Sequence, residues 1–413
     1  MIFYRAVVAL TVLPCFAAYL QTVRPALFPP YLQHAHSSSS SSSSSAAAPT
    51  STTTLPEMLV NTIMNSPLKG PIVSVARNTM VSTALKAGLP WGALAARLVT
   101  ELGGVEAIES AALAITSGSA APTPSTITVP PYYQQAFHGY PLGNLEYLAG
   151  IEQEIAGKAV GARNFPAEGL GGEAVLRGCY AREVESLCGN SLFEAAAGGV
   201  VLDMGCGSGT STRQLARMFP KATKVIGMDL SPYMLLVGRY LQTGKARAWW
   251  VDPVTEESCD RIELLYGNIE ETGLASGSCD VVSLSLVLHE LPEATSLRVL
   301  KEAYRLLKPG GVLCIMEMDP QSPGYVKLRA NPALFSILRS TEPWLAEYFS
   351  LAPVLPAALL DAGFATVKVS AATGRHFCMA ATKGGLVDVR PCDAERLRQD
   401  KHIANSLDTN TRG

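Results

Sequence analysis

The sequence predicts a doubly wound α/β fold with a seven-stranded, mostly parallel sheet. From Gly199 onward, short apolar runs bounded by glycines alternate with helical patterns. Strand–helix alternation of this kind gives a parallel sheet that is covered by helices on both faces. The first apolar run also leads directly into a glycine-rich loop, which is where open sheets of this class bind their ligands.

The candidate strands are the seven short apolar runs 200–202, 224–228, 262–266, 281–288, 312–316, 366–370 and 377–381. Three helices are predicted between them. Residues 232–241 form one, with Ser231 placed to cap it and Pro232 in its first turn. Residues 292–307 form the second, because Leu297, Leu300, Tyr304 and Leu307 follow the spacing of one buried face. The third, 356–362, is stopped by Gly363.

The chain before the sheet falls into three parts. Residues 1–56 contain no Asp, Glu or Lys, with an apolar run at 6–20 and a serine homopolymer at 37–45. This composition predicts a disordered targeting segment, with a signal anchor on a flexible stalk as the alternative. Residues 57–117 are expected to form a helical extension, and 118–131 a linker. The α/β domain is expected at 132–383 and a disordered tail at 384–413.

Composition excludes several classes of function. The formal net charge is −2, and no block of Lys and Arg offers the surface needed to hold a phosphate backbone, so nucleic acid is not an expected partner. The nine cysteines include no CxxC pair, which predicts neither a disulfide framework nor a metal site. Hydrophobic residues make up 48% of the chain, which is compatible with peripheral membrane association.

The glycine loop indicates the cofactor. Gly205, Gly207 and Gly209 alternate between a predicted strand and a predicted helix. Thr210 stands where a dinucleotide fingerprint needs its third glycine, and the loop has no P-loop lysine. Asp203, two residues before the first glycine, would repel a pyrophosphate but attract the ammonium and sulfonium groups of S-adenosylmethionine. The loop therefore favours S-adenosylmethionine.

A second acid supports this interpretation. Asp229 ends the second predicted strand, 26 residues after Asp203. An acid at the carboxyl end of that strand lies beside the ligand crevice and can accept hydrogen bonds from two ribose hydroxyls. The alternative is that Asp229 caps the helix that begins at Pro232.

Taken together, these residues resemble the class I S-adenosylmethionine-dependent methyltransferases, in the group that includes ubiquinone and menaquinone C-methyltransferases. The resemblance also includes 267–270 and the Leu-Lys-Pro-Gly-Gly string at 307–311. It implies a Rossmann-like sheet and places Asn268 and Ile269 against the adenine. The full set of cofactor-binding residues that it implies is Asp203, Gly205, Cys206, Gly207, Gly209, Asp229, Leu230, Asn268, Ile269 and Ser285. An apparent insertion at 243–261 departs from the family's spacing.

A narrower resemblance concerns 132–140, 143–145 and 340–344, which are similar to a cyanobacterial and plastid methyltransferase group of undefined substrate. It implies that the targeting segment is a plastid (chloroplast) address. Signal anchoring in the secretory pathway is the alternative.

The acceptor should meet the cofactor at the carboxyl end of the fourth strand. His289, just after that strand, is the predicted general base, with a helix-start contact as the alternative. Glu290 is expected to face solvent or to cap the helix. His138, Tyr132, Tyr133 and Tyr140 are expected either to form a lid or to pack against the sheet edge. Glu317 and Asp319 could face the acceptor, whereas the His376 side chain is interpreted as structural.

Two functions remain open at this point. The first is methyl transfer to a small, lipophilic acceptor such as a prenylquinone or phenol. The second is a non-catalytic protein of the same fold that serves as a binding or assembly factor. The sequence decides neither the acceptor atom nor the oligomeric state.

Overall fold

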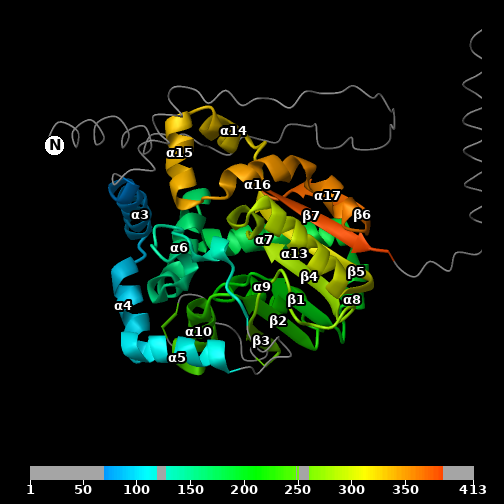
Figure 1. The fold of residues 1–413 in the computed structure, drawn as a ribbon, viewed down its shortest axis with the longest axis horizontal. Helices are drawn as coiled ribbons and strands as arrows, with labels where there is room; N and C mark the ends of the chain where they lie inside the picture. The colour runs from blue at the N-terminus through cyan, green and yellow to red at the C-terminus, as the bar shows by residue number, and fades with distance from the viewer. Residues whose placement is uncertain (1–68, 119–126, 248, 251–259, 385–413) are drawn as a thin grey trace, which may run out of the picture.

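The computed structural model describes residues 69–118, 127–247, 249–250 and 260–384 (Figure 1). The predicted targeting segment, most of the linker and the tail therefore lie outside the described residues. At the centre is one seven-stranded sheet in the order β3-β2-β1-β4-β5-β7-β6. Its strands are β1 Val200–Met204, β2 Lys224–Asp229, β3 Ile262–Tyr266, β4 Cys279–Ser285, β5 Leu307–Met318, β6 Phe364–Ala371 and β7 His376–Lys383.

The sheet confirms the predicted fold class. Strands β1 to β5 pair in parallel, and β7 runs antiparallel to both β5 and β6. Strand order reverses between β1 and β4: the chain goes from β1 toward β2 and from β4 toward β5, in opposite directions along the sheet. Ligands of open α/β sheets bind beyond the carboxyl ends of the strands at such a point.

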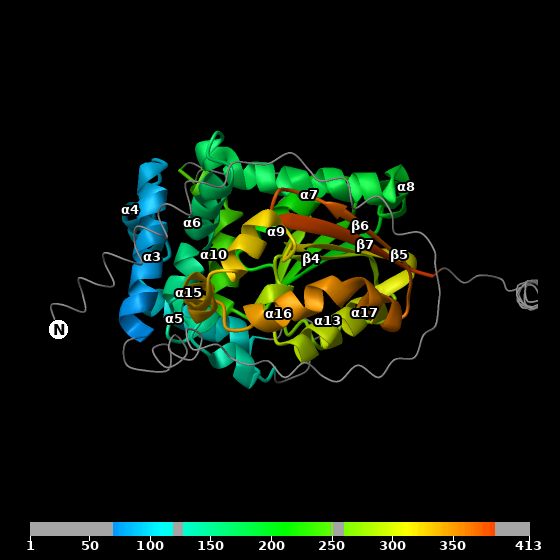
Figure 2. The same cartoon turned by 90° about the horizontal axis from the view of Figure 1, so that it is seen from above.

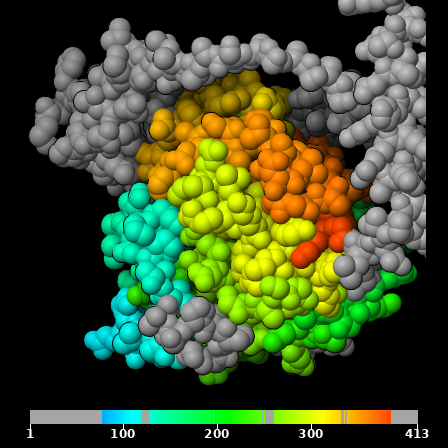
Figure 3. Space-filling model, turned by 45° about the vertical axis from the view of Figure 1, so that its right-hand side comes forward, coloured from blue at the N-terminus to red at the C-terminus, as the bar shows by residue number. Residues whose placement is uncertain are grey.

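Helices cover both faces of the sheet, as Figure 2 shows. One face carries α7 Gly172–Cys188, α8 Asn190–Ala195, α9 Thr210–Met218 and α10 Pro232–Leu241. The other carries α13 Glu293–Leu306, α16 Leu345–Leu351 and α17 Leu355–Asp361. Val299, Leu300 and Ala303 of α13 are fully buried, because their spacing places them on the face toward the sheet. In Figure 3 the surfaces of α13, yellow-green, and of α16 and α17, orange, adjoin.

The helical extension shares a core with the α/β domain. Its helices are α3 Lys69–Lys86, α4 Trp91–Glu101 and α5 Val105–Ser117. They pack on α6 Tyr147–Asn164 and on α10, at one side of the molecule in Figure 1. Leu98 of α4 and Ile155 of α6 are fully buried in the apolar cluster between them. The extension therefore packs against the α/β domain through a shared apolar core and is not a separate unit.

The remaining short elements are η2 Pro131–Gln134, η3 Gly143–Leu145, η4 Gly169–Gly171, α11 Gly244–Arg247, η5 Leu288–Glu290, α14 Pro323–Arg329, α15 Pro332–Thr341 and η6 Ala352–Val354. Among the described residues, no helix combines the length and apolarity needed to cross a membrane.

Local expectations are confirmed at several elements and wrong at two strands. Strand β5 begins at Leu307, which was predicted to end the preceding helix, and not at 312. Strand β3 and helix α10 have the predicted bounds, and Ser231 Oγ accepts the N–H of Met234 as a cap at 3.3 Å. The fourth strand was expected to run to 288 but ends at Ser285. Leu286 adopts a left-handed conformation with φ of 61°, which breaks the strand and turns the chain into η5.

Candidate active site

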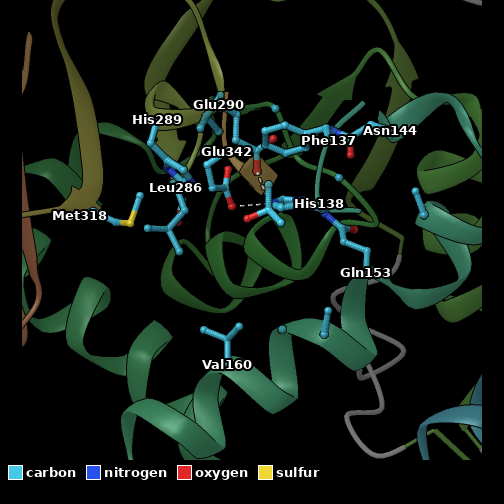
Figure 4. Close-up of a pocket in the computed structure, with 18 of the residues that line it drawn as sticks. Phe137, His138, Asn144, Gln153, Val160, Leu286, His289, Glu290, Met318 and Glu342 are labelled. Carbon is cyan, nitrogen blue, oxygen red and sulfur yellow. Dashed lines mark hydrogen bonds and ion pairs between the residues drawn. The ribbon is translucent and has the colours of Figure 1, made fainter. Parts of the chain in front are cut away.

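A cavity of about 520 Å³ opens at the carboxyl ends of β1, β2 and β4, where the topology predicts a ligand. Its walls come from the glycine loop, the ends of these strands, α6, the segment 132–144 and the helices that follow β5. Figure 4 shows His289, Glu290, Glu342 and His138 gathered in one part of the cavity, with Val160 of α6 facing them.

The glycine loop satisfies its own backbone donors. The N–H groups of Gly205 and Cys206 donate to the Met228 carbonyl, and that of Gly207 to Asp229 Oδ2 at 2.8 Å. The next N–H, of Ser208, donates to Gln153 Oε1 of α6 at 2.6 Å. Dinucleotide and P-loops instead point free N–H groups at phosphates. These four donors are already used, so this loop is poorly suited to a pyrophosphate.

The glycines are needed because the loop is crowded. Gly205 and Gly207 have φ of 77° and 54°, a region that favours glycine. A β-carbon at Gly205 would lie 2.9 Å from the Val287 side chain, and one at Gly207 would lie 2.0 Å from Gln153 Nε2. The bare backbone thus forms the cavity wall at this point.

Asp229 faces the cavity as predicted. Oδ2 accepts the Gly207 N–H, and Oδ1 accepts the Ser231 N–H at 2.8 Å and the Tyr133 hydroxyl at 3.4 Å. Burial raises the pKa of Asp229, and the two backbone donors oppose that rise. Asp229 therefore positions the loop and also lines the cavity.

Most of the other predicted cofactor residues lie in the same wall: Gly205, Cys206, Gly207, Leu230, Asn268, Ile269 and Ser285. The apparent insertion does not displace Asn268. Tyr266, the last residue of β3, pairs with Asp229 in the sheet, so Asn268 follows at the same edge. Their contacts with a ligand stay predictions.

Asp203 and Gly209 are the two predicted residues that do not line the cavity. Asp203 is fully buried, and its Oδ2 accepts hydroxyl hydrogen bonds from Ser211 and Thr212 of α9, each at 2.7 Å. Burial raises the pKa of Asp203 to about 6, although both hydroxyl donors oppose the rise. It ties the end of β1 to α9 behind the loop, whereas the sequence predicted a position beside the ligand.

The turn after β4 places His289 in the cavity. After Leu286 the chain forms η5, and His289 is buried within it. Glu317, at the end of β5, is fully buried. Its Oε2 lies 2.9 Å from His289 Nδ1, and its Oε1 accepts the Leu288 N–H at 2.6 Å. Glu317 and Asp319, which the sequence placed as possible acceptor contacts, do not line the cavity; Glu317 instead supports the imidazole from behind.

The ionisation of His289 differs from the prediction. Burial by itself lowers the pKa of His289, but the Glu317 carboxylate outweighs burial and raises that pKa to about 10. At neutral pH the ring carries both protons and acts as a hydrogen-bond donor. A general base needs a ring nitrogen that carries no proton. The structure therefore supports the predicted position of His289 in the cavity, but not its predicted role as a general base.

Glu290 also differs from expectation. Its side chain lines the cavity instead of facing bulk solvent, because η5 turns this residue back from the start of α13. His138 Nε2 lies 4.0 Å from Glu290 Oε1 and 2.7 Å from Glu342 Oε1. Burial raises the pKa of Glu290 to about 7, with both histidines opposing the rise. Figure 4 shows the His138–Glu342 pair as a dashed line.

The aromatic segment lies over the cavity. Tyr132, Tyr133, His138 and Tyr140 all line it. Three of them are fixed by carboxylates: Tyr132 by Glu270 and Tyr140 by Glu152, each at 2.6 Å, and Tyr133 by Asp229. The His138 N–H donates to the Thr341 carbonyl at 2.9 Å. The segment fits both alternatives that the sequence left open, because it borders the cavity while Tyr132 also packs against the apolar core of the sheet.

Sequence reasoning missed the contribution of α6 and α7. The cavity-lining residues Gln153, Lys158, Arg163 and Arg177 come from these helices, and α7 was not predicted. Its sequence has a weak amphipathic pattern, so no signal was available. His376, interpreted as structural, also lines the cavity.

Comparison with known proteins identifies the domain. Residues 202–315 match the family model described as a methyltransferase domain. The chain carries a class I S-adenosylmethionine-dependent methyltransferase domain. It is 34% identical over 135 residues to a demethylmenaquinone methyltransferase of Listeria monocytogenes, covering 32% of this chain and 51% of that protein. A demethylmenaquinone methyltransferase of Lactococcus lactis is 34% identical over 151 residues, covering 36% and 52%. The chain thus spans about half the length of these relatives.

Among solved structures, the chain is similar to CrArsM, an arsenic(III) S-adenosylmethionine methyltransferase from Chlamydomonas reinhardtii. The two share 21% sequence identity with a TM-score of 0.33, and the match covers 51% of this chain and 74% of that one.

Proposed function

We propose that this protein transfers a methyl group from S-adenosylmethionine to a small acceptor. The observation that carries the proposal is the glycine loop. Its N–H groups are used within the protein, while the carboxylate of Asp229 lines the cavity beside it. Such a wall suits a ligand with hydroxyl donors and a positive charge better than it suits a phosphate.

The described residues fit this cofactor. Gly205 and Gly207 leave bare backbone at the cavity wall, where a side chain would clash with Val287 or Gln153. We expect Asp229, which lines the cavity, to accept hydrogen bonds from ribose hydroxyls, and Asn268 and Ile269 to border the adenine. The cofactor, when bound, supplies an electrophilic methyl group on a sulfonium.

The protein's own contribution is orientation and charge. Holding an acceptor in line with the methyl group removes much of the entropic barrier. His289, protonated and held by Glu317, can donate a hydrogen bond to an oxygen of the acceptor and stabilise negative charge that develops there. The reactive form of a phenol or enol is the oxyanion, so such an acceptor would first release its proton to solvent, and His289 would then stabilise the charge left on the oxygen until the methyl group is transferred.

The lining supports a partly lipophilic acceptor of prenylquinone or phenol type. Leu286, Met318, Leu338 and Trp344 contribute apolar surface beside His289. The cavity volume of about 520 Å³ is in the range of small-molecule sites. The relatives named demethylmenaquinone methyltransferase make quinols the first acceptors to test.

The test is an assay with methyl-labelled S-adenosylmethionine. The protein is incubated with a panel of quinols and phenols, and methylated products are detected by mass spectrometry. Label transfer that depends on His289 supports the proposal. Stoichiometric cofactor binding without transfer to any member of the panel, or to total lipid extract, would favour the non-catalytic alternative.

A further inference from the structure

The cavity has a basic wall that the methyl-transfer chemistry does not use. We define this wall as Lys158 and Arg163 of α6, Arg177 of α7, and Arg375 in the turn before β7; all four line the cavity. Methyl transfer from a sulfonium needs no cluster of cations around the acceptor. Their presence inside a mostly apolar cavity therefore calls for a different explanation.

Lys158 is a buried cation of the basic wall without an anionic partner of its own among the described residues. Its side chain lines the cavity, and the residue is only 7% exposed. Among the residues that the structure describes, no group accepts a hydrogen bond from its ammonium. The acid that it influences is Glu173, whose carboxylate already pairs with Arg177 at 2.8 Å. Buried ammonium groups are costly to leave without an anion.

Arg375 is the second cation to consider, and it is half-buried, whereas Lys158 is buried. Within the described part of the chain, its guanidinium has no carboxylate partner. It lies against α14: a β-carbon placed on Gly324 would be 3.8 Å from Arg375 Nε. Its electrostatic neighbours include Tyr325 and His376. Burial, with a smaller contribution from Arg375, lowers the pKa of His376 to about 4, so that ring is neutral at neutral pH.

Arg177 connects these two cations. It pairs with Glu173, close to Lys158, and it also lowers the pKa of His376, close to Arg375. One of its guanidinium nitrogens donates to Ser285 Oγ at 2.8 Å, at the end of β4. The nearby carboxylates of Glu154 and Glu173 are each in an ion pair with an arginine. Neither of these two carboxylates is therefore the ion-pair partner of Lys158 or Arg375.

We propose that the basic wall binds an anionic group, a carboxylate or a phosphate, on the methyl acceptor. This inference rests on the proposed function and names the acceptor class more closely: a molecule with a hydroxyl-bearing ring near His289 and an anionic group near Lys158 and Arg375. Arginine and lysine are the residues that recognise such groups, through charge-assisted hydrogen bonds.

The cofactor's own carboxylate is the other possible source of the anion. Strand β7, which Arg375 precedes, is three strands from β1 in the sheet order, a separation of roughly 14 Å at the usual strand spacing. Arg375 also contacts α14, which lies beyond β5 on the acceptor side. The cofactor is expected beside β1 and β2, so we assign the anion at Arg375 to the acceptor.

The test uses calorimetry to compare two anionic probes with one uncharged probe, with the protein saturated by S-adenosylhomocysteine. The probes are 4-hydroxybenzoate, 4-hydroxyphenyl phosphate and phenol. Wild-type protein should bind at least one anionic probe about tenfold or more tightly than phenol. Arg375→Met and Lys158→Met should each remove most of that preference, and Arg375→Lys should keep part of it. Arg217→Met, on the exposed surface of α9, is the matched control and should keep all of it.

Three outcomes would overturn the inference. Wild-type protein without a preference for the anionic probes would show that the cations are structural. A tenfold loss of S-adenosylhomocysteine affinity in Arg375→Met, with the probe preference intact, would assign the wall to the cofactor. An equal loss of preference in the Arg217→Met control would show a non-specific charge effect. The proposed function fails separately, if wild-type protein does not bind S-adenosylhomocysteine at all.

Discussion

Glu317 Oε2 lies 2.9 Å from Nδ1 of His289, and the same carboxylate accepts the backbone N–H of Leu288. One buried acid at the end of β5 therefore fixes both the imidazole and the turn that presents it. That turn begins at Leu286, whose left-handed conformation is uncommon for a branched side chain. Strain of this kind persists only where the surroundings hold it in place.

The His289–Glu317 pair should make stability depend on pH. The pKa of His289 is raised from 6.5 to about 10, so the folded protein holds a proton that the unfolded chain releases. The stabilisation is fully present below pH 6.5 and is lost as pH rises through 10. Denaturant unfolding of wild type and His289→Gln between pH 6 and 10.5 should show a difference that shrinks with rising pH, by at most ~1.4 kcal/mol per pH unit. A constant difference would mean that the pair is not ionised.

His289 should be essential for turnover and dispensable for cofactor binding. His289→Gln keeps a hydrogen-bonding side chain but loses the positive charge, so turnover should fall by roughly 10²–10³ while S-adenosylhomocysteine affinity holds. Wild-type activity should persist to about pH 9 and fall as His289 deprotonates. Activity that instead rises with a pKa near neutrality, and loses this rise in His289→Gln, would restore the general-base role.

Asp203 should stabilise the glycine loop indirectly, by holding the start of α9 through Ser211 and Thr212. Replacing it by alanine leaves the buried hydroxyls of Ser211 and Thr212 without their acceptor, which costs ~1–3 kcal/mol for each unsatisfied group. Thermal unfolding of Asp203→Ala should show a clear loss of stability. Asp203→Asn, which retains one acceptor oxygen, should recover part of it. A stable Asp203→Ala variant that has lost only cofactor affinity would place the carboxylate against the ligand, as the sequence suggested.

Asp229 should contribute directly to cofactor affinity. Its carboxylate lines the cavity and accepts from Gly207 and Ser231. Asp229→Ala should weaken S-adenosylhomocysteine binding by about 1.5–3 kcal/mol, the range for hydrogen bonds to a charged group. The matched control is Asp319→Ala, since Asp319 follows β5 and does not line the cavity. Equal affinity in wild type and Asp229→Ala would leave Asp229 with only a capping role.

Sequence patterns predicted the fold and the cofactor side of the cavity better than the acceptor side. The strands, the loop at Gly205 and the position of Asp229 follow from local signals, because periodicity and glycine spacing are set by neighbours in the chain. The environment of His289 could not be predicted, since its pKa depends on Glu317 from another strand. Lys158 and Arg375 were missed for the same reason: they line one cavity only because α6, α7 and the β6–β7 turn pack around it.

The most direct test is a calorimetric titration of wild-type protein with S-adenosylhomocysteine, NAD and ATP under the same conditions. The N–H groups of Gly205, Cys206, Gly207 and Ser208 donate to Met228, Asp229 and Gln153, so these four are not free to bind a phosphate. We expect one-site binding of S-adenosylhomocysteine and no heat from NAD or ATP. Binding of NAD or ATP more tightly than S-adenosylhomocysteine would contradict the assignment of the site.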